Sequence, residues 1–113
     1  MPKYLFVYRN EPMPAPPSPE QMQAALAEWG VWIETFMKTG NILDPGDGLK
    51  ECGRVLRKGG TAVTDGPFVE AKEILGGYSV VQADSYDGAV AVAKECPGAK
   101  YGTLEIRELA GYS

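Results

Sequence analysis

Residues 63–81, V-T-D-G-P-F-V-E-A-K-E-I-L-G-G-Y-S-V-V, place an acidic turn, a short charged segment and a glycine pair between two apolar strands. The sequence predicts the turn at residues 65–68. Gly66 tolerates positive φ, Pro67 fixes its own φ, and the Asp65 carboxylate can accept hydrogen bonds from backbone N–H groups just downstream. Further strands and helices are predicted on both sides of this segment.

Outward from this segment, the hydrophobic pattern predicts five strands and two helices. The strands are expected at residues 3–9, 51–57, 61–64, 77–83 and 102–109, with a turn at 58–60 and a loop at 44–48. The first helix begins after Ser18 with a capping box to Gln21 and stops at Gly40-Asn41. The second spans residues 86–95 and is closed by Pro97-Gly98. The residues expected on the inner helix faces are Met22, Ala25, Leu26, Trp29, Trp32, Ile33, Phe36, Met37, Ala89, Val90 and Ala93.

This pattern predicts a single domain over residues 1–113, of the α+β class. With one strand more between the two helices, the order matches the β-α-β-β-α-β pattern of a ferredoxin-like sheet with both helices on one face. The strands at 3–9 and 77–83 carry large apolar residues on both faces, so the face without helices would be an exposed apolar patch. We therefore expect a two-fold homodimer joined sheet to sheet.

The charge and composition exclude several classes of function. Lys and Arg total 11 against 15 Asp and Glu, the net charge is −4, and there is no basic stretch to meet nucleic acid. No apolar run is long enough for a membrane helix, and we expect a soluble, cytoplasmic protein. Histidine is absent, and Cys52 and Cys96 have no metal-ligand spacing, so we expect reduced, partly buried thiols and neither a metal nor an organic cofactor.

Several short motifs of this sequence resemble the signature of the DGPF group of YCII-related proteins. The resemblance rests on V-T-D-G-P-F at 63–68 with Glu70, Lys72 and Glu73, on G-G-Y at 76–78, and on shorter matches at 3–5, 18–20, 101–102 and 105–107. It implies a dimeric α+β barrel, in a family with no single settled activity whose genes often neighbour those of extracytoplasmic-function sigma factors. Gly88 and Glu108 depart from the family pattern, which usually has glutamate and proline there.

Some YCII-like relatives are enzymes thought to pair a histidine with an aspartate, for instance in dehydrochlorination of an aromatic ring. Because this chain has no histidine, that precedent transfers only as far as an aspartate at the pocket. Asp65 is the catalytic candidate, as a general base in the cleft between the sheet and the first helix. The alternative is that Asp65 only fixes the turn before Pro67.

Five residues are candidates for ligand contact: Tyr8, Arg54, Phe68, Lys72 and Tyr78. Arg54 and Lys72 suit an anionic group, with Glu70 or Glu73 positioning it, although charged residues in such segments are usually solvated. Trp29 and Trp32 either roof an aromatic ligand or pack in the core and the dimer interface.

Two functions remain open at this point. One is a non-catalytic module that binds a small ligand or serves an accessory or regulatory role. The other is a cofactor-independent enzyme acting on a small carbonyl or aromatic compound, with Asp65 as the base and Arg54 or Tyr78 as electrophilic support. The absence of histidine and of a metal spacing favours the first.

Overall fold

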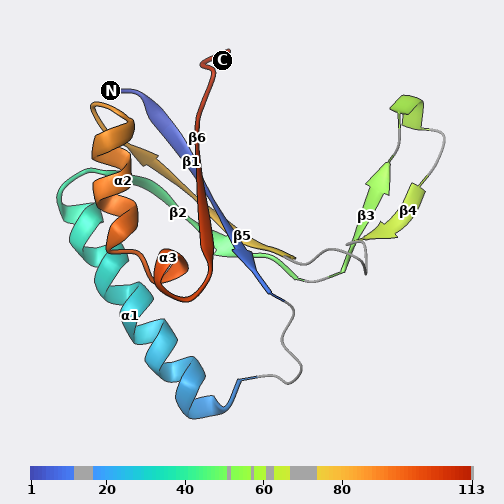
Figure 1. Ribbon diagram of the computed structural model, residues 1–113, viewed down its shortest axis with the longest axis horizontal. Coiled ribbons are helices and arrows are strands. Elements are labelled where there is room, and N and C mark those ends of the chain that lie inside the picture. The colour runs from blue at the N-terminus through green and yellow to red at the C-terminus, as the bar shows by residue number, and fades with distance from the viewer. Residues whose placement is uncertain (12–16, 51, 57, 61–62, 67–73, 113) are drawn as a thin grey trace.

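The computed structural model describes residues 1–11, 17–50, 52–56, 58–60, 63–66 and 74–112 (Figure 1). A four-stranded antiparallel sheet lies at its centre, in the order β2-β5-β1-β6. The elements follow along the chain as β1 (Lys3–Asn10), α1 (Pro19–Lys38), β2 (Ile42–Gly48), β3 (Gly53–Leu56), β4 (Val63–Gly66), β5 (Ile74–Gln82), α2 (Tyr86–Lys94), α3 (Pro97–Tyr101) and β6 (Thr103–Glu108). This is the expected mixed α+β class, and it is compatible with a ferredoxin-like fold.

The core lies between the sheet and the helices. Along β1, Tyr4, Phe6 and Tyr8 are buried beneath the helices, whereas Leu5 and Val7 point to the other face and are half-buried. The other buried apolar residues of the cluster are Trp32, Ile42, Val81, Ala83, Ala89, Val92, Ala93 and Cys96. The alternation expected for β1 is therefore confirmed, with one face covered by helices.

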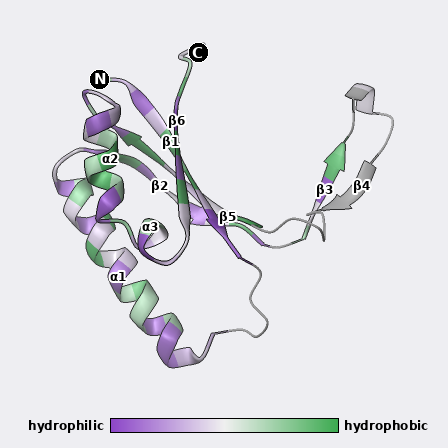
Figure 2. Ribbon diagram, viewed as in Figure 1, coloured by the Kyte–Doolittle hydropathy of each residue, from purple (hydrophilic) through white to green (hydrophobic). Residues whose placement is uncertain are grey.

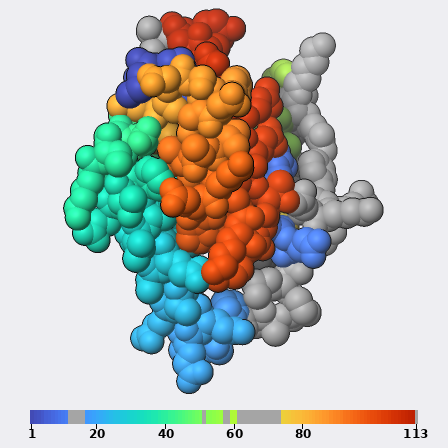
Figure 3. All heavy atoms as spheres, turned by 60° about the vertical axis from the view of Figure 1, so that its left-hand side comes forward, coloured from blue at the N-terminus to red at the C-terminus, as the bar shows by residue number. Residues whose placement is uncertain are grey.

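Helix α1 begins as the sequence predicts. Ser18 Oγ accepts a hydrogen bond from the Gln21 backbone N–H at 3.1 Å, and Gln21 Oε1 accepts one from the Ser18 N–H at 2.9 Å. Trp32 is buried and donates from Nε1 to the carbonyl of Val92 at 3.1 Å. Met22 and Leu26, expected on the inner face, are 52% and 67% exposed. The first turns of α1 extend past α3 and the end of α2, so no helix covers them there (Figure 3).

Helix α2 differs from the prediction at one position of its inner face. Ala89 and Ala93 are buried as expected, but Val90 is 37% exposed and Val92 takes the inner position. The backbone is helical again from Pro97, which the sequence had indicated only as a stop. A proline suits this place because its missing N–H is not needed at the first helical position.

The second strand of the sheet was not predicted. Residues 44–48, expected as a loop, form most of β2, which pairs with β5 through two register shifts. Proline, glycine and aspartate hid this strand from a side-chain pattern, because only its backbone pairs. The predicted strand at 51–57 is instead β3, which pairs with β4 as a separate two-stranded sheet. The turn between them uses Gly59 and Gly60 at positive φ.

The expected turn at 65–68 is corrected in part. Asp65 and Gly66 are the last residues of β4, paired with Arg54 and Gly53, rather than turn residues. Pro67 and Phe68 lie outside the described residues. The β3–β4 hairpin stands on the side of the sheet opposite the helices (Figure 1).

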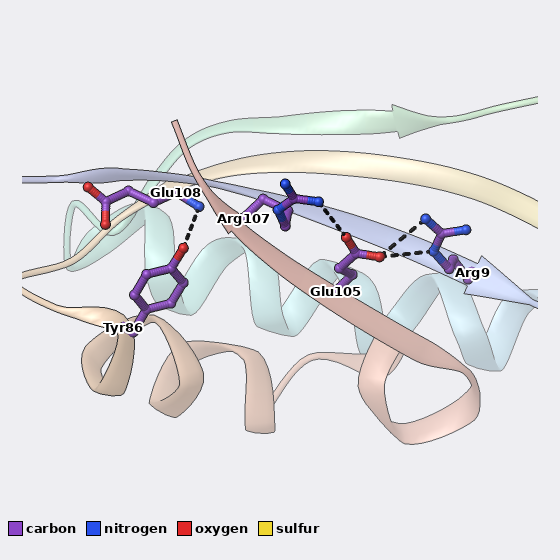
Figure 4. A network of polar contacts seen from close by, with 5 residues as sticks. All are labelled: Arg9, Tyr86, Glu105, Arg107 and Glu108. Carbon is purple, nitrogen blue, oxygen red and sulfur yellow. Dashed lines mark hydrogen bonds and ion pairs between the residues drawn. The ribbon is translucent and has the colours of Figure 1, made fainter. Parts of the chain in front are cut away.

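The face of the sheet without helices carries a polar network at its β6 edge (Figure 4). Arg9 Nε donates to Glu105 Oε1 at 3.2 Å, and an Arg107 guanidinium nitrogen donates to Glu105 Oε2 at 3.2 Å. These contacts, led by the hydrogen bond from Arg107, lower the pKa of Glu105. Nearer the C-terminus, the Tyr86 hydroxyl accepts a hydrogen bond from the Glu108 N–H at 2.9 Å and ties α2 to β6.

The remaining expectations concern the cysteines and the membrane. Cys96 is buried, whereas Cys52 is exposed rather than partly buried. Within the described part of the chain, no helix is both long and apolar enough to cross a membrane.

Candidate functional site

A cleft of about 830 Å³ lies between the first half of α1, helix α3 and the adjoining ends of three strands. It forms where α1 extends past the helices beside it (Figures 1 and 3). The lining from the helices is mainly apolar, from Ala24, Ala25, Leu26, Trp29, Ile33 and Pro97, with Gln21, Gly98 and Tyr101. The strands add Tyr8, Asn10, Pro45, Gly46, Asp47, Gly48, Gly76, Gly77 and Tyr78, and Pro17 lies before α1.

Tyr8 is fixed in this cleft by a buried chain of hydrogen bonds. Its hydroxyl donates to Ser79 Oγ at 2.8 Å, and Ser79 in turn donates to the carbonyl of Pro45 at 2.7 Å. Cys96 Sγ lies 3.8 Å from the Tyr8 oxygen and donates to it. Burial raises the pKa of Tyr8 far above its ordinary value, so the phenol is neutral at physiological pH. Tyr8 therefore orients the cleft wall, and its hydroxyl is already committed within the protein.

Two aromatic rings stand together in the cleft. The Tyr8 and Trp29 rings meet edge to face with centroids 5.0 Å apart, and Trp29 meets the buried Trp32 in the same way at 5.8 Å. Gly98 lets α3 approach this pair, because a Cβ at that position would lie 2.5 Å from Tyr8 Cδ1. The aromatic wall is thus held by the sheet, α1 and α3 together.

A charged contact joins α1 to α3 beside the cleft. Glu28 Oε1 accepts a hydrogen bond from the Tyr101 hydroxyl at 2.9 Å and from Lys100 Nζ at 3.2 Å. The Tyr101 hydrogen bond, followed by that from Lys100, lowers the pKa of Glu28. Among the described residues, Glu28 Oε2 is buried without a partner. Because Tyr101 lines the cleft, this contact fixes one of its walls.

Few ionisable side chains line the described part of the cleft. Asp47 is the one carboxylate among the described lining residues, and its Oδ1 accepts the N–H of Gly48 at 2.8 Å. No group of three or more potential metal ligands occurs in the described ranges. The arrangement suits a ring-shaped, largely apolar molecule with a few polar substituents at its edge.

The family model of the YCII-related domain matches residues 15–112 of this sequence. The chain belongs to the YCII-related family. The resemblance drawn from the DGPF motif is therefore confirmed.

No curated protein matches this YCII-related chain in sequence. Among solved structures it is similar to 5-chloro-2-hydroxyhydroquinone dehydrochlorinase from Burkholderia phenoliruptrix AC1100, in complex with 2,5-dihydroxybenzoquinone. The identity is 13%, the TM-score is 0.47, and the alignment covers 95% of this chain and 92% of the other.

The structure separates the residues that the sequence grouped into one site. Tyr8 and Tyr78 both line the cleft, and so does Trp29. Arg54 and Asp65 are register partners on the β3–β4 hairpin, and neither is among the described lining residues. The role of Asp65 as a general base stays a prediction. Phe68 and Lys72, with Glu70 and Glu73, lie outside the described residues.

Several lining residues were missed because they were assigned to other roles. Leu26 and Ile33 continue the apolar face of α1, which the sequence indicates as core. The length of α1 was an available signal. Twenty residues make a helix about 30 Å long, whereas the nine residues of α2 make one of only about 14 Å, so α1 must extend past its neighbour. Asp47 and Gly48 were missed with β2, and Tyr101 with α3.

Proposed function

We propose that this YCII-related protein binds a small, largely apolar organic molecule with a ring system, in the cleft between α1, α3 and the strand ends. The observation that carries the proposal is the cleft itself. Its volume of about 830 Å³ falls within the range typical of small-molecule sites. Its aromatic wall of Tyr8 and Trp29 suits a flat ring.

The binding function is favoured over catalysis by the state of the polar groups. Tyr8 is held neutral, and its hydroxyl already donates to Ser79 and accepts from Cys96. Asp65, the base that an enzyme of this kind would need, is on the hairpin and not among the described cleft residues. The second candidate, a cofactor-independent enzyme, has no comparable observation in its favour.

We also propose that the protein is a homodimer joined through the open sheet face. Leu5, Val7 and Val80 are half-buried there, and Tyr78 is 36% exposed. Figure 2 shows hydrophobic residues along parts of the central strands. A second copy would bury this surface.

An enlarged side chain in the cleft tests the binding proposal. Phenols, aromatic ketones and aromatic carboxylates are first screened for saturable thermal stabilisation. For a compound that stabilises the protein, Ala24→Leu should weaken binding at least tenfold by calorimetry, because Ala24 lines the cleft. Ala27→Leu makes the same change on the same helix at an exposed position outside the lining and should leave the affinity unchanged. Equal affinities for the two variants would place binding elsewhere.

A further inference from the structure

Among the described residues, no helix or strand other than the hairpin's own two packs closely on the β3–β4 hairpin. It forms a separate two-stranded sheet, opposite the helices (Figure 1). A two-stranded hairpin is at best marginally stable in water without a third strand or a packed face. Leu56 on β3 is nevertheless 63% exposed, and β3 is coloured as hydrophobic in Figure 2. Within the described part of the chain this apolar surface is left open, and a packing partner from outside the chain would cover it.

The dimensions of the chain agree with a hairpin that stands away from the rest of the molecule. Its Cα radius of gyration is 15.7 Å, whereas a compact chain of 113 residues has about 13 Å. The molecule measures 43 × 42 × 18 Å, and the helices, the sheet and the hairpin follow one another along its longest axis (Figure 1). One helix layer and one sheet account for about 20 Å of that length. The remainder is enough for another sheet, since packed sheets lie about 10 Å apart.

The open sheet face lies on the same side as the hairpin and ends beside it. Leu75, the residue of β5 paired with Arg9, is 46% exposed at this end of the sheet, and Tyr78 is 36% exposed. Leu49, which follows β2, is 44% exposed. The apolar surface thus continues from the open face toward the hairpin. A second copy that covers the face would also meet the hairpin.

We propose that the β3–β4 hairpin is an arm that packs against a second copy of this chain, so that Arg54 and Asp65 lie at the interface between copies. This inference rests on the homodimer proposed above. It does not depend on the cleft binding a ligand. Because the interface is two-fold, each copy gives one arm and receives one. Any role of Arg54 and Asp65 in recognition is then exerted between subunits.

Photo-crosslinking between isotopically distinct copies tests the arm. The full chain carries p-benzoylphenylalanine in place of Leu56, and copies labelled with ¹⁴N and ¹⁵N are mixed at a concentration where light scattering gives a dimer. Irradiation should give a covalent dimer with peptide pairs that join one label to the other. The matched control replaces Val31, which is 66% exposed on α1, and should give no such pairs.

The outcomes separate the two proposals. Cross-links confined to single copies, no covalent product from a dimeric sample, or the same yield from the Val31 control would overturn the arm and leave the homodimer standing. A monomer by light scattering at micromolar concentration would overturn both. Neither result bears on the affinities of the Ala24 and Ala27 variants, which test the cleft.

A charge on the arm provides a second measurement. Leu56→Asp should raise the dissociation constant of the dimer at least tenfold, because the aspartate would be desolvated against the partner. Leu56→Met and Val31→Asp should leave it unchanged. Circular dichroism should show that all three variants keep the secondary structure, since both positions are exposed in the single chain. An unchanged dissociation constant for Leu56→Asp would contradict the arm.

Discussion

Tyr8 and Ser79 show how single side chains shape the cleft. Ser79 is fully buried and accepts from Tyr8 while it donates to the carbonyl of Pro45. This series of hydrogen bonds ties the bulged strand β2 to the centre of the sheet. The polar groups of the cleft wall are thereby satisfied without water, which is what burial requires of them.

Removal of the Tyr8 hydroxyl should lower the free energy of unfolding less than removal of the Ser79 hydroxyl. Tyr8→Phe removes one hydroxyl and leaves Ser79 donating to Pro45, so we expect a loss of about 1 kcal/mol in the free energy of unfolding. Ser79→Ala leaves the Tyr8 hydroxyl without its acceptor and the Pro45 carbonyl without this donor, so we expect about 2 kcal/mol. Urea denaturation at neutral pH measures both. A larger loss of unfolding free energy for Tyr8→Phe would mean that Ser79 does not bridge the Tyr8 hydroxyl and the Pro45 carbonyl.

At the scale of residues, the sequence predicted some of the individual cleft residues but not which of the candidates lie together in space. Tyr8 and Tyr78 were both named as ligand-contact candidates, and both line the cleft. They do so differently, because Tyr8 pairs with Gly77 on the helix side of the sheet, whereas Tyr78 pairs with Val7 of the open face. Arg54 and Asp65 were selected for their chemistry. No local pattern shows that residues 53–66 pair only with one another, because that depends on which strands join the main sheet.

At the scale of elements, the contact between α1 and α3 is one that a change in pH should weaken. Glu28 accepts from Tyr101 and Lys100, and its pKa is lowered in the folded protein. A carboxylate with a lowered folded pKa stabilises the fold at pH values above its ordinary pKa of 4.5. That contribution is lost as the pH falls through the folded value.

Glu28→Gln should therefore be less stable than the parent protein, by a constant amount from neutral pH down to about 4.5. Below that, the difference should shrink as Glu28 of the parent is protonated. Urea unfolding from pH 7 to pH 3 measures it. Glu34→Gln is the control, since it breaks the exposed ion pair with Lys38 on the same helix at 3.2 Å. A difference that grows toward low pH would contradict this role for Glu28.

The elements that the sequence predicted best are those with a local signal. Helix α1 has a capping box and a regular apolar face, and β1 alternates bulky residues, so both were located within about a residue. Strand β2 has neither signal, because it contributes mainly backbone hydrogen bonds to β5. Helix α3 is too short for a periodic pattern to show.

At the scale of the whole molecule, one chain does not cover all of its apolar surface. The helices bury one face of the sheet, and the other face and the hairpin remain open on the far side (Figure 1). The cleft lies between α1, α3 and the strand ends, whereas the proposed homodimer would form through the opposite face of the sheet.

The central claim is that a small molecule binds in the cleft beside Trp29, and the two indole N–H signals test it most directly. Trp29 lines the cleft, whereas Trp32 is buried with its N–H bonded to Val92. In a ¹H–¹⁵N spectrum titrated with the strongest stabilising compound of the screen, the Trp29 indole signal should shift with saturation, together with the amides of Gly46, Gly77 and Gly98, while the Trp32 indole signal stays in place. Shifts confined to the hairpin or the open sheet face, with the Trp29 signal unmoved, would contradict the account.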